Sequence, residues 1–343
     1  MSIIVTGGAG FIGSNFILDW FDNNSEAIIN IDLLTYAGNI KNLEYIKNNK
    51  NFFFIKGDIN NKKLIKKTFK DYKPRAIINF AAESHVDRSI SSPENFIKTN
   101  ILGVYNLLEI SKEYWENLSS DNKNHFKFFH ISTDEVYGEL QLSKPPFKEE
   151  NSYAPNSPYS ASKASCDHLV KAWNKTYGLP TLISNCSNNF GPYQYPEKLI
   201  PLCIVNSLQN KNIPIYGDGK QIRDWLYVKD HCSAIREILD KGTTGETYNI
   251  GGNCEKTNID VVHSICDILD NLKPNLKRNS YRELITYVKD RPGHDKRYAV
   301  NSEKILKEIG WIPKENFESG ISKTVNWYLE NTDWIKELFD KSK

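Results

Sequence analysis

A hydroxyl and two carboxylates stand side by side at Thr133, Asp134 and Glu135, directly after the apolar run 126–131. Such a run is typical of a buried strand of a parallel sheet, and open α/β sheets bind ligands at the carboxyl ends of their strands. Neighbouring acids in different environments can take different protonation states, one as acid and one as base. The triplet therefore predicts a site for elimination. By itself, an acidic turn after a strand remains the alternative.

Tyr159 and Lys163 form a second pair that could do chemistry. Ser157 and Pro158 are typical of the cap and first residue of a helix, which places Tyr159 and Lys163 one turn apart on the same face. A free tyrosine has a pKa of about 10, but a neighbouring ammonium and the positive charge of a nicotinamide both favour phenolate. Tyr159 is predicted to take a hydroxyl proton while a hydride passes to NAD. Without a cofactor site, a surface pair would be the usual explanation of this spacing.

A glycine-rich segment supplies that cofactor site. Gly7, Gly10 and Gly13 follow the first apolar run and open a helix, so a pyrophosphate would lie at the helix N-terminus. Asp32 ends the second predicted strand and is placed to accept hydrogen bonds from an adenosine ribose. Because Asp32 would repel a 2′-phosphate, NAD is favoured over NADP. A glycine-rich turn without a ligand is the alternative reading.

Two further strand ends would border the cofactor. Asp58 follows the third predicted strand and could accept from the adenine amino group, and this role is no more favoured by the chemistry than a structural one. The fourth strand ends at Phe80, Ala81 and Ala82, whose small alanines would leave room for the middle of the cofactor.

The elements that must position these residues alternate between strands and helices. Strands are predicted at 2–6, 27–32, 52–56, 75–80 and 126–132, and helical patterns occur at 11–22, 39–48, 61–71 and 95–118. This order predicts an α/β fold with a Rossmann-type, doubly wound parallel sheet. We expect an NAD-binding domain at 1–178, with strands near 180–186 and 245–250 returning to its sheet. A smaller, interleaved C-terminal substrate domain is expected at 190–343, with loop-rich stretches at 192–224 and 257–297.

Composition narrows the class of partner. The 343 residues carry 44 Lys and Arg against 42 Asp and Glu, so no basic field argues for nucleic acid or an anionic membrane surface. The chain shows no leader pattern and no apolar run of the roughly 20 residues needed to span a bilayer, so cytoplasm is expected. The six cysteines lack the spacing of a metal site and are expected to be reduced and buried, and no metal is predicted.

Taken together, these motifs resemble the extended short-chain dehydrogenase/reductase family, in its nucleotide-sugar branch, over nearly the whole chain. The segments 82–89, 132–138 and 291–295 are similar to those of the nucleotide-sugar 4,6-dehydratases that act on dTDP-glucose. Related 4-epimerases have no acid pair after the threonine, and GDP-mannose dehydratases carry Ser at the position of Asp134. The resemblance implies a hydro-lyase that keeps its NAD bound and regenerates it in each turnover.

The resemblance also implies roles for the catalytic residues. Tyr159, steadied by Lys163 and with Thr133 on the sugar 4-hydroxyl, would oxidise C4. The new ketone acidifies C5–H, so Glu135 would remove that proton while a protonated Asp134 donates to the departing 6-hydroxyl. The hydride then returns to C6, and Glu135 returns its proton to C5. The product would be dTDP-4-keto-6-deoxyglucose.

Two sets of binding residues follow from the same resemblance. The cofactor set is Gly7, Gly10, Phe11, Ile12, Gly13, Asp32, Leu33, Thr35, Asp58, Ile59, Phe80, Ala81, Ala82, Ser84, Thr99, Tyr159 and Lys163. The substrate set is Ser84, His85, Thr133, Asn188, Lys198, Leu199, Pro214, Tyr216, Arg223, Asn258, Arg291 and His294. From chemistry alone, Arg223 and Arg291 suit a diphosphate, with a solvated arginine as the alternative for each.

Assembly and function leave alternatives open. Family members are typically homodimers that pair through helices matching 97–115 and 160–177. A UDP-sugar 4-epimerase or a decarboxylase of the same fold remains a rival function. A non-catalytic NAD-binding scaffold is a rival of another class, although it would normally have lost some of the five catalytic residues that are intact here.

Overall fold

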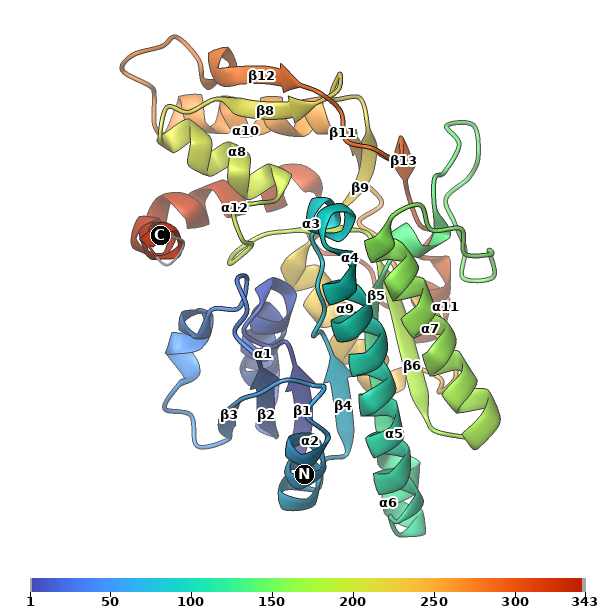
Figure 1. Ribbon diagram of the computed structural model, residues 1–343. Coiled ribbons are helices and arrows are strands. Elements are labelled where there is room, and N and C mark those ends of the chain that lie inside the picture. The colour runs from blue at the N-terminus through green and yellow to red at the C-terminus, as the bar shows by residue number, and fades with distance from the viewer. Residues whose placement is uncertain (1, 341–343) are drawn as a thin grey trace.

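A seven-stranded parallel sheet forms the centre of the larger part of the protein (Figure 1), in a computed structural model that describes residues 2–340. Its strand order is β3-β2-β1-β4-β5-β6-β10, and every neighbouring pair is parallel. This is the order of a doubly wound dinucleotide-binding sheet, extended by one strand. The strands are β1 Ser2–Thr6, β2 Ala27–Asp32, β3 Phe52–Lys56, β4 Ala76–Asn79, β5 Lys127–Thr133, β6 Thr181–Cys186 and β10 Thr247–Ile250.

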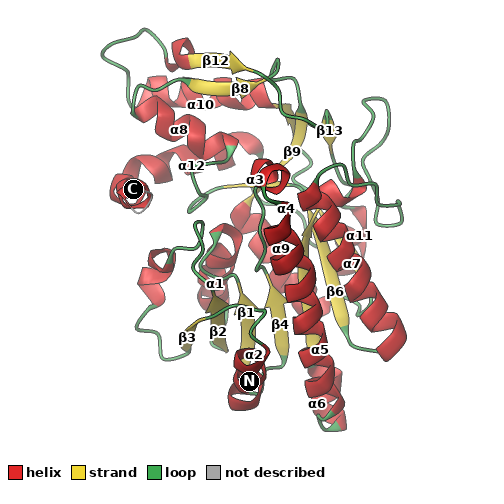
Figure 2. Ribbon diagram, viewed as in Figure 1, coloured by secondary structure: helices red, strands yellow, loops and turns green. Residues whose placement is uncertain are grey.

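Helices cover both faces of the sheet (Figure 2). Side chains alternate between the two faces along each strand, so the side chains on both faces are buried. Ile3 and Val5 of β1 lie in one core with α1 and α9, whereas Ile4 lies in the other. The helices on the two faces are α1 Phe11–Asn23 and α9 Val228–Lys241 on one side, and α2 Lys62–Tyr72, α5 Gly103–Glu116 and α7 Pro158–Tyr177 on the other.

The predicted strands and two of the four predicted helices of the first 135 residues are confirmed to within about two residues at each end. Two helical segments differ from the prediction. Residues 39–48 contain the 3₁₀ segment η1 Ile40–Ile46, not an α-helix. Residues 95–118 are interrupted, because α4 Pro93–Phe96 and the π-helical η2 Ile97–Leu102 precede α5. Such π segments often occur at functional sites.

Two small sheets and their helices form a second core above the carboxyl end of the large sheet (Figure 1). The prediction of loop-rich stretches was wrong for α8 Leu199–Leu208 and α10 Asn258–Leu272. In α10, Val261, Val262, Ile265 and Leu269 are buried at helical spacing behind the Thr257 cap. The elements are β7 Asn188–Phe190, β9 Ile222–Tyr227, β11 Glu255–Thr257 and β13 Arg297–Tyr298, β8 Ile213–Tyr216 with β12 Ile285–Val288, and α8 Leu199–Leu208, α10 Asn258–Leu272 and α12 Phe317–Glu330.

The chain returns to the large sheet late, as predicted for β6 and β10. In addition, α9 and Ile305 of α11 pack in the same core, so part of the range 190–343 belongs to the larger layer. Met1 and 341–343 of the two predicted ranges lie outside the described residues. The remaining elements are α3 Val86–Ser91, α6 Ser120–His125, η3 Asp134–Tyr137, η4 Tyr281–Leu284, α11 Glu303–Ile309 and α13 Thr332–Asp340.

Candidate active site

The acid pair lies where the central strand β5 ends. Thr133 is the last residue of β5 and caps η3, with its hydroxyl accepting from the Glu135 N–H at 3.3 Å. The turn closes at Gly138, whose φ of +81° is in the left-handed region, and a Cβ there would lie 2.1 Å from the Ala154 carbonyl oxygen. The sharp turn holds Asp134 and Glu135 at the carboxyl edge of the sheet.

Asp134 is buried, with 2% of its surface exposed. Burial raises the pKa of its carboxyl well above the usual range, and the nearby charges of Glu135 and Asp224 raise it further. Its Oδ2 atom has no hydrogen-bond partner among residues 2–340. These surroundings favour the protonated acid, as the sequence predicts for a proton donor.

Glu135 occupies a different environment, although it is the next residue. It is half-buried, and burial raises its pKa, but the charges of Arg291, Lys198 and Arg223 oppose that shift. At Glu135, three cations lower the pKa and one anion, Asp295, raises it, whereas at Asp134 two anions raise the pKa and one cation, Arg223, lowers it. The geometry supports one acid and one base.

We expect Asp134→Asn to be more stable than the wild type at neutral pH. The folded-state pKa of Asp134 is raised above its unfolded value of about 4. The contribution of Asp134 to the free energy of unfolding is therefore fully present below about pH 4 and is lost as the pH rises toward the folded-state pKa. Asparagine does not titrate, so the difference should be larger at about pH 8 than at about pH 5. Urea unfolding at the two pH values measures it, and an equal difference at both would contradict the prediction.

Tyr159 and Lys163 lie in the first turns of α7, whose start has the predicted cap. Ser157 and Ser160 form a capping box, and Pro158 is the first helical residue. The Lys163 ammonium donates to the Ile131 carbonyl oxygen at 2.7 Å. Its distance to His130 Nε2 is 3.1 Å.

The expected activation of Tyr159 by Lys163 does not follow from this arrangement. Burial raises the pKa of Tyr159 well above its usual value, and the Glu135 charge raises it further. The nearby Thr133 hydroxyl lowers it, whereas Lys163 is directed toward β5. The positive charge of a bound nicotinamide is then the remaining predicted source of phenolate stabilisation.

A buried polar network behind Lys163 was missed from the sequence. Asn79 Nδ2 and His130 Nδ1 are 3.1 Å apart, and Thr6 donates to Asn79 Oδ1 at 2.6 Å. Ser132 donates to Asp167 at 2.9 Å. A histidine and three further polar residues in strands covered on both faces were the available signal, since buried polar groups need partners.

The glycine turn fits a dinucleotide. Gly7 has a φ of +72°, and a Cβ there would lie 2.6 Å from the Ala81 backbone nitrogen. A Cβ on Gly13 would lie 2.4 Å from the Gly7 carbonyl oxygen. Gly10 caps α1 without any side-chain hydrogen bond, so backbone N–H groups at this helix start can bind an anion. The backbone of Phe80 and Ala81 borders this turn, and the half-buried Ala82 follows them.

Asp32 organises the same turn from the end of β2. Its Oδ2 accepts from the Ala9 N–H at 2.9 Å, and its Oδ1 accepts from the Leu34 N–H at 2.7 Å. Each carboxylate oxygen can accept a second bond, which leaves capacity for a ribose. Asp58 is engaged through Oδ1 by the Asn60 N–H at 2.8 Å, so its other oxygen is the candidate acceptor for adenine.

We expect Asp32→Ala to weaken NAD binding by at least about tenfold, because losing one ribose hydrogen bond costs about 1.4 kcal/mol. Stability should also fall by about 1–3 kcal/mol, since Ala9 and Leu34 lose their acceptor. Calorimetric NAD titration and thermal unfolding measure the two effects. Asp22→Ala, an exposed change at the end of α1, is the matched control. Unchanged NAD affinity in Asp32→Ala would remove the ribose role.

Three cations of the predicted substrate set converge on Glu135. Lys198 donates to the Ser84 carbonyl oxygen at 3.0 Å. Arg223 lies 4.5 Å from the ring centre of Tyr298 and donates to the Asp295 carbonyl oxygen at 2.9 Å. With Arg291, they all act on the Glu135 charge. The structure thus brings three predicted substrate-binding residues near the acid pair, and two of them, Arg223 and Arg291, are the predicted diphosphate ligands.

The other predicted substrate residues are less uniformly placed. Tyr216 and His294 are stacked edge to face with ring centres 6.4 Å apart, and Arg291 lies 3.7 Å from Asp87. Asn188 has a buried Oδ1 without a partner in the described part of the chain. His85 caps α3, Pro214 lies in β8, and Leu199 and Asn258 begin α8 and α10, without contacts that assign a role.

Leu33 and Thr35 of the cofactor set are exposed, Ile59 is buried, and Thr99 is a half-buried residue of η2.

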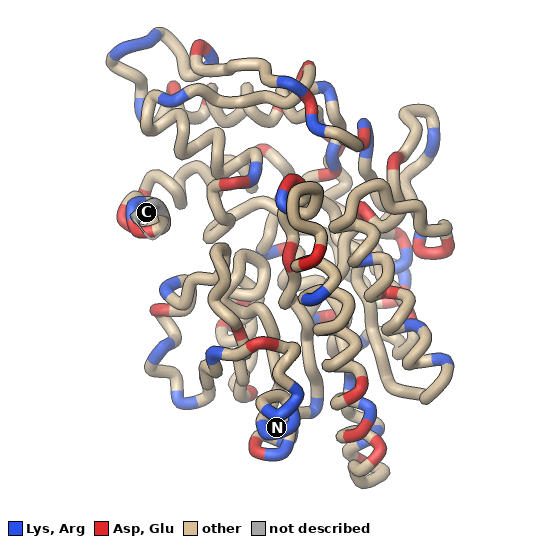
Figure 3. Tube along the Cα trace, viewed as in Figure 1, with Lys and Arg blue, Asp and Glu red and all other residues tan. Residues whose placement is uncertain are grey.

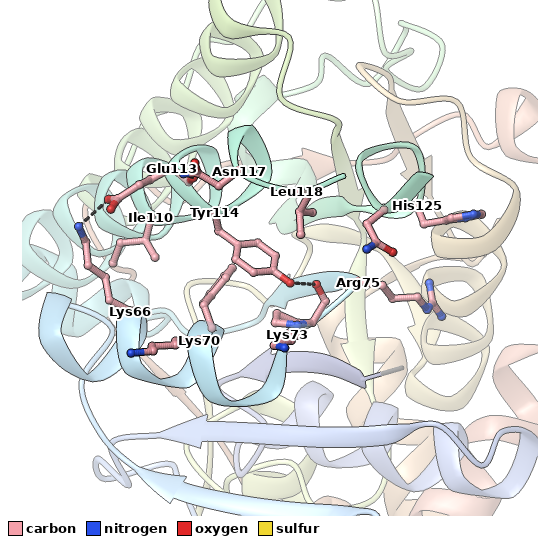
Figure 4. Close-up of a pocket in the computed structure, with 13 residues that line it drawn as sticks. Lys66, Lys70, Lys73, Arg75, Ile110, Glu113, Tyr114, Asn117, Leu118 and His125 are labelled. Carbon is pink, nitrogen blue, oxygen red and sulfur yellow. Dashed lines mark hydrogen bonds and ion pairs between the residues drawn. The ribbon is translucent and has the colours of Figure 1, made fainter. Parts of the chain in front are cut away.

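A separate cavity of about 470 Å³ lies between α2 and α5 (Figure 4). Phe69, Tyr114 and Leu118 line it, and Lys70 and Lys73 stand at its edge. It borders the residues that lead into the amino ends of β4 and β5, the opposite end of the sheet from Glu135. It does not belong to the site described above.

Comparisons with known proteins agree with this geometry. Residues 4–324 match the family model described as GDP-mannose 4,6 dehydratase. The chain is 56% identical to a dTDP-glucose 4,6-dehydratase of Salmonella typhimurium, covering 98% of this chain and 95% of that one.

Solved structures point the same way. A dTDP-glucose 4,6-dehydratase from Bacillus anthracis in complex with NAD matches with a TM-score of 0.87 and 48% identity, over 98% of this chain and 99% of that one. One from Streptomyces venezuelae with NAD and TYD bound matches with a TM-score of 0.89 and 40% identity, over 98% and 100%. Among the described residues, no helix is long and apolar enough to cross a membrane.

Proposed function

We propose that this chain, which belongs to the dTDP-glucose 4,6-dehydratase family, removes water from dTDP-glucose to give dTDP-4-keto-6-deoxyglucose. The observation that carries the proposal is the contrast between Asp134 and Glu135. One is buried beside like charges, and the other faces three cations, within reach of a tyrosine suited to alcohol oxidation.

The proposed reaction has three parts: oxidation at C4, loss of water across C5 and C6, and return of the hydride and proton to the sugar. Bound NAD accepts a hydride at the start and returns it at the end. Tyr159 takes the proton of the sugar 4-hydroxyl, with Thr133 orienting that hydroxyl. Glu135 then removes the C5 proton, and Asp134 protonates the departing 6-hydroxyl. Finally, Glu135 returns its proton to C5.

Binding is divided between the two cores. We assign cofactor binding to the range 1–178 and nucleotide-sugar binding mainly to 190–343, with Lys198, Arg223 and Arg291 on the diphosphate. Planar guanidinium groups suit such oxygens, and Arg223 is held by backbone carbonyls from two segments.

A substrate panel tests the function. The full chain with NAD is incubated with dTDP-glucose, UDP-glucose and GDP-mannose, and products are identified by NMR and mass spectrometry. We expect loss of one water with dTDP-glucose. Formation of a 4-epimer without loss of water would support the rival epimerase, and NAD binding without any turnover would support a scaffold. Asp134 argues against the epimerase, because related epimerases lack the acid pair.

We also propose a cytoplasmic homodimer that pairs through 97–115 and 160–177. Four large apolar side chains on these helices are exposed, namely Ile97 at 47%, Leu102 at 51%, Tyr105 at 37% and Tyr177 at 44%. Tyr105 and Tyr177 both contact Trp173 edge to face, so exposed rings of the two helices lie close together. Exposed apolar patches are typical of interfaces. Sedimentation should show a dimer that Leu102→Asp converts to a monomer, with Leu142→Asp in an exposed loop as the control. A monomeric wild type would contradict this assembly.

A further inference from the structure

The protons of the proposed reaction do not all return to their starting positions. Glu135 takes a proton from C5 and gives it back, so it ends unchanged. Tyr159 gains the proton of the 4-hydroxyl, and this proton is not returned to the sugar because the product is a ketone. Asp134 loses its proton to the departing water. Each turnover therefore leaves one proton too many on Tyr159 and one too few on Asp134.

Thr133 lies between these two groups. A hydroxyl has one donor and two acceptor positions. The Thr133 oxygen accepts from the Glu135 N–H at 3.3 Å and donates to Asp134 Oδ1 at 3.4 Å. The same hydroxyl lies close enough to Tyr159 to lower the pKa of its phenol. The last distance is longer than an ordinary O–H···O bond, as is common at catalytic sites before substrate binds.

The surroundings of Asp134 restrict other proton sources. Asp134 is 2% exposed and Thr133 is 7% exposed, so bulk water has little access to the carboxyl. Glu135 and Asp224 disfavour a lasting carboxylate on Asp134 and so favour a proton moving toward it. The amino group of Lys163 points instead to Ile131 and His130, away from the acid pair.

We propose that the Thr133 hydroxyl returns a proton from Tyr159 to Asp134 after each turnover. The proposal rests on the proposed function. The Tyr159 O–H bond breaks as its proton joins Thr133 Oγ1, and the proton already on Thr133 moves to Asp134 Oδ1. One phenolate and one carboxylic acid are restored, and the net charge is unchanged. Once the product has left, no sugar hydroxyl separates Tyr159 from Thr133, so the path is complete in the free site.

Thr133→Val and Thr133→Ser separate this role from the first oxidation. Valine keeps the shape and loses the hydroxyl, whereas serine keeps the hydroxyl. Both are loaded with NAD and mixed with excess dTDP-glucose in a rapid-quench experiment. In Thr133→Val we expect about one product per site, followed by turnovers at least about tenfold slower than the first. Thr133→Ser should show no such gap.

The protonation state supplies a second readout. Infrared difference spectra of the holoenzyme report the protonated Asp134 carboxyl, assigned by its absence in Asp134→Asn. After one turnover of Thr133→Val, this band should be missing and recover at the slow rate. Equal slowing of first and later turnovers, or a band that recovers at the wild-type rate, would overturn the proposal. If the wild type forms no dehydrated product, the proposed function itself fails.

Discussion

Glu135→Gln is expected to bind NAD and dTDP-glucose normally and to lose turnover by about 10²–10⁴-fold, the usual contribution of a general base. The C5 proton then has no acceptor. Oxidation at C4 should continue, because the Glu135 charge raises the pKa of Tyr159 and its removal favours phenolate. Reduced nicotinamide should therefore accumulate in a single turnover, and no solvent deuterium should enter C5.

The matched control is Glu139→Gln, an exposed glutamate four residues further along that accepts from the Lys296 N–H at 2.8 Å. It removes the same charge near the same turn and should leave turnover unchanged. Deuterium incorporation at C5 at the wild-type rate in Glu135→Gln would assign the base to another residue. Loss of sugar binding would instead show that Glu135 acts mainly in the ground state.

Features encoded in short stretches were predictable from the sequence. The Gly7 turn, the Ser157 cap and the end of β5 each depend on neighbours within a few residues, where backbone geometry and hydrogen bonding decide the outcome. The placement of Thr133 next to a tyrosine 26 positions later followed from joining two such motifs by family resemblance. In the structure the Thr133 hydroxyl lies close enough to Tyr159 to lower the pKa of its phenol.

Features set by packing between distant segments were not predictable. Asp224 raises the pKa of Asp134 from strand β9, and Arg291 stabilises Glu135 from a loop before β13. The direction of Lys163 toward His130 depends on how α7 lies on β5. By contrast, α10 was predictable, because Val261, Val262, Ile265 and Leu269 stand at helical spacing in the sequence, and the polar residues between them were mistaken for a loop.

The protonation states of Asp134 and Glu135 depend on individual neighbouring charges and not on the overall charge of the protein. Lys and Arg residues are interspersed with Asp and Glu over the fold (Figure 3), so no large field of one sign sets the protonation states. The difference between Asp134 and Glu135 arises because Lys198 and Arg291 lower the pKa of Glu135, whereas Asp134 has only Arg223, which acts on both acids, against the charges of Glu135 and Asp224. A change to any of these cations should therefore alter acid–base chemistry as well as substrate affinity.

Tyr159→Phe is expected to lower turnover by about 10²–10⁴-fold at an earlier step than Glu135→Gln. Phenylalanine keeps the packing of the ring, which meets Phe96 edge to face with centres 6.3 Å apart, so folding should be retained. The 4-hydroxyl proton then has no acceptor, and hydride transfer cannot begin.

The two variants are told apart by the cofactor, because Glu135→Gln should accumulate reduced nicotinamide in a single turnover and Tyr159→Phe should form none. Tyr153→Phe, at a half-buried tyrosine whose hydroxyl accepts from Asn185 at 3.0 Å, removes a phenol without touching Thr133 and serves as the control. Reduced nicotinamide in Tyr159→Phe at the wild-type rate would contradict the assignment. The base for the oxidation would then be another group that contacts Thr133. Asp134 is such a group, because its carboxyl accepts a hydrogen bond from the Thr133 hydroxyl.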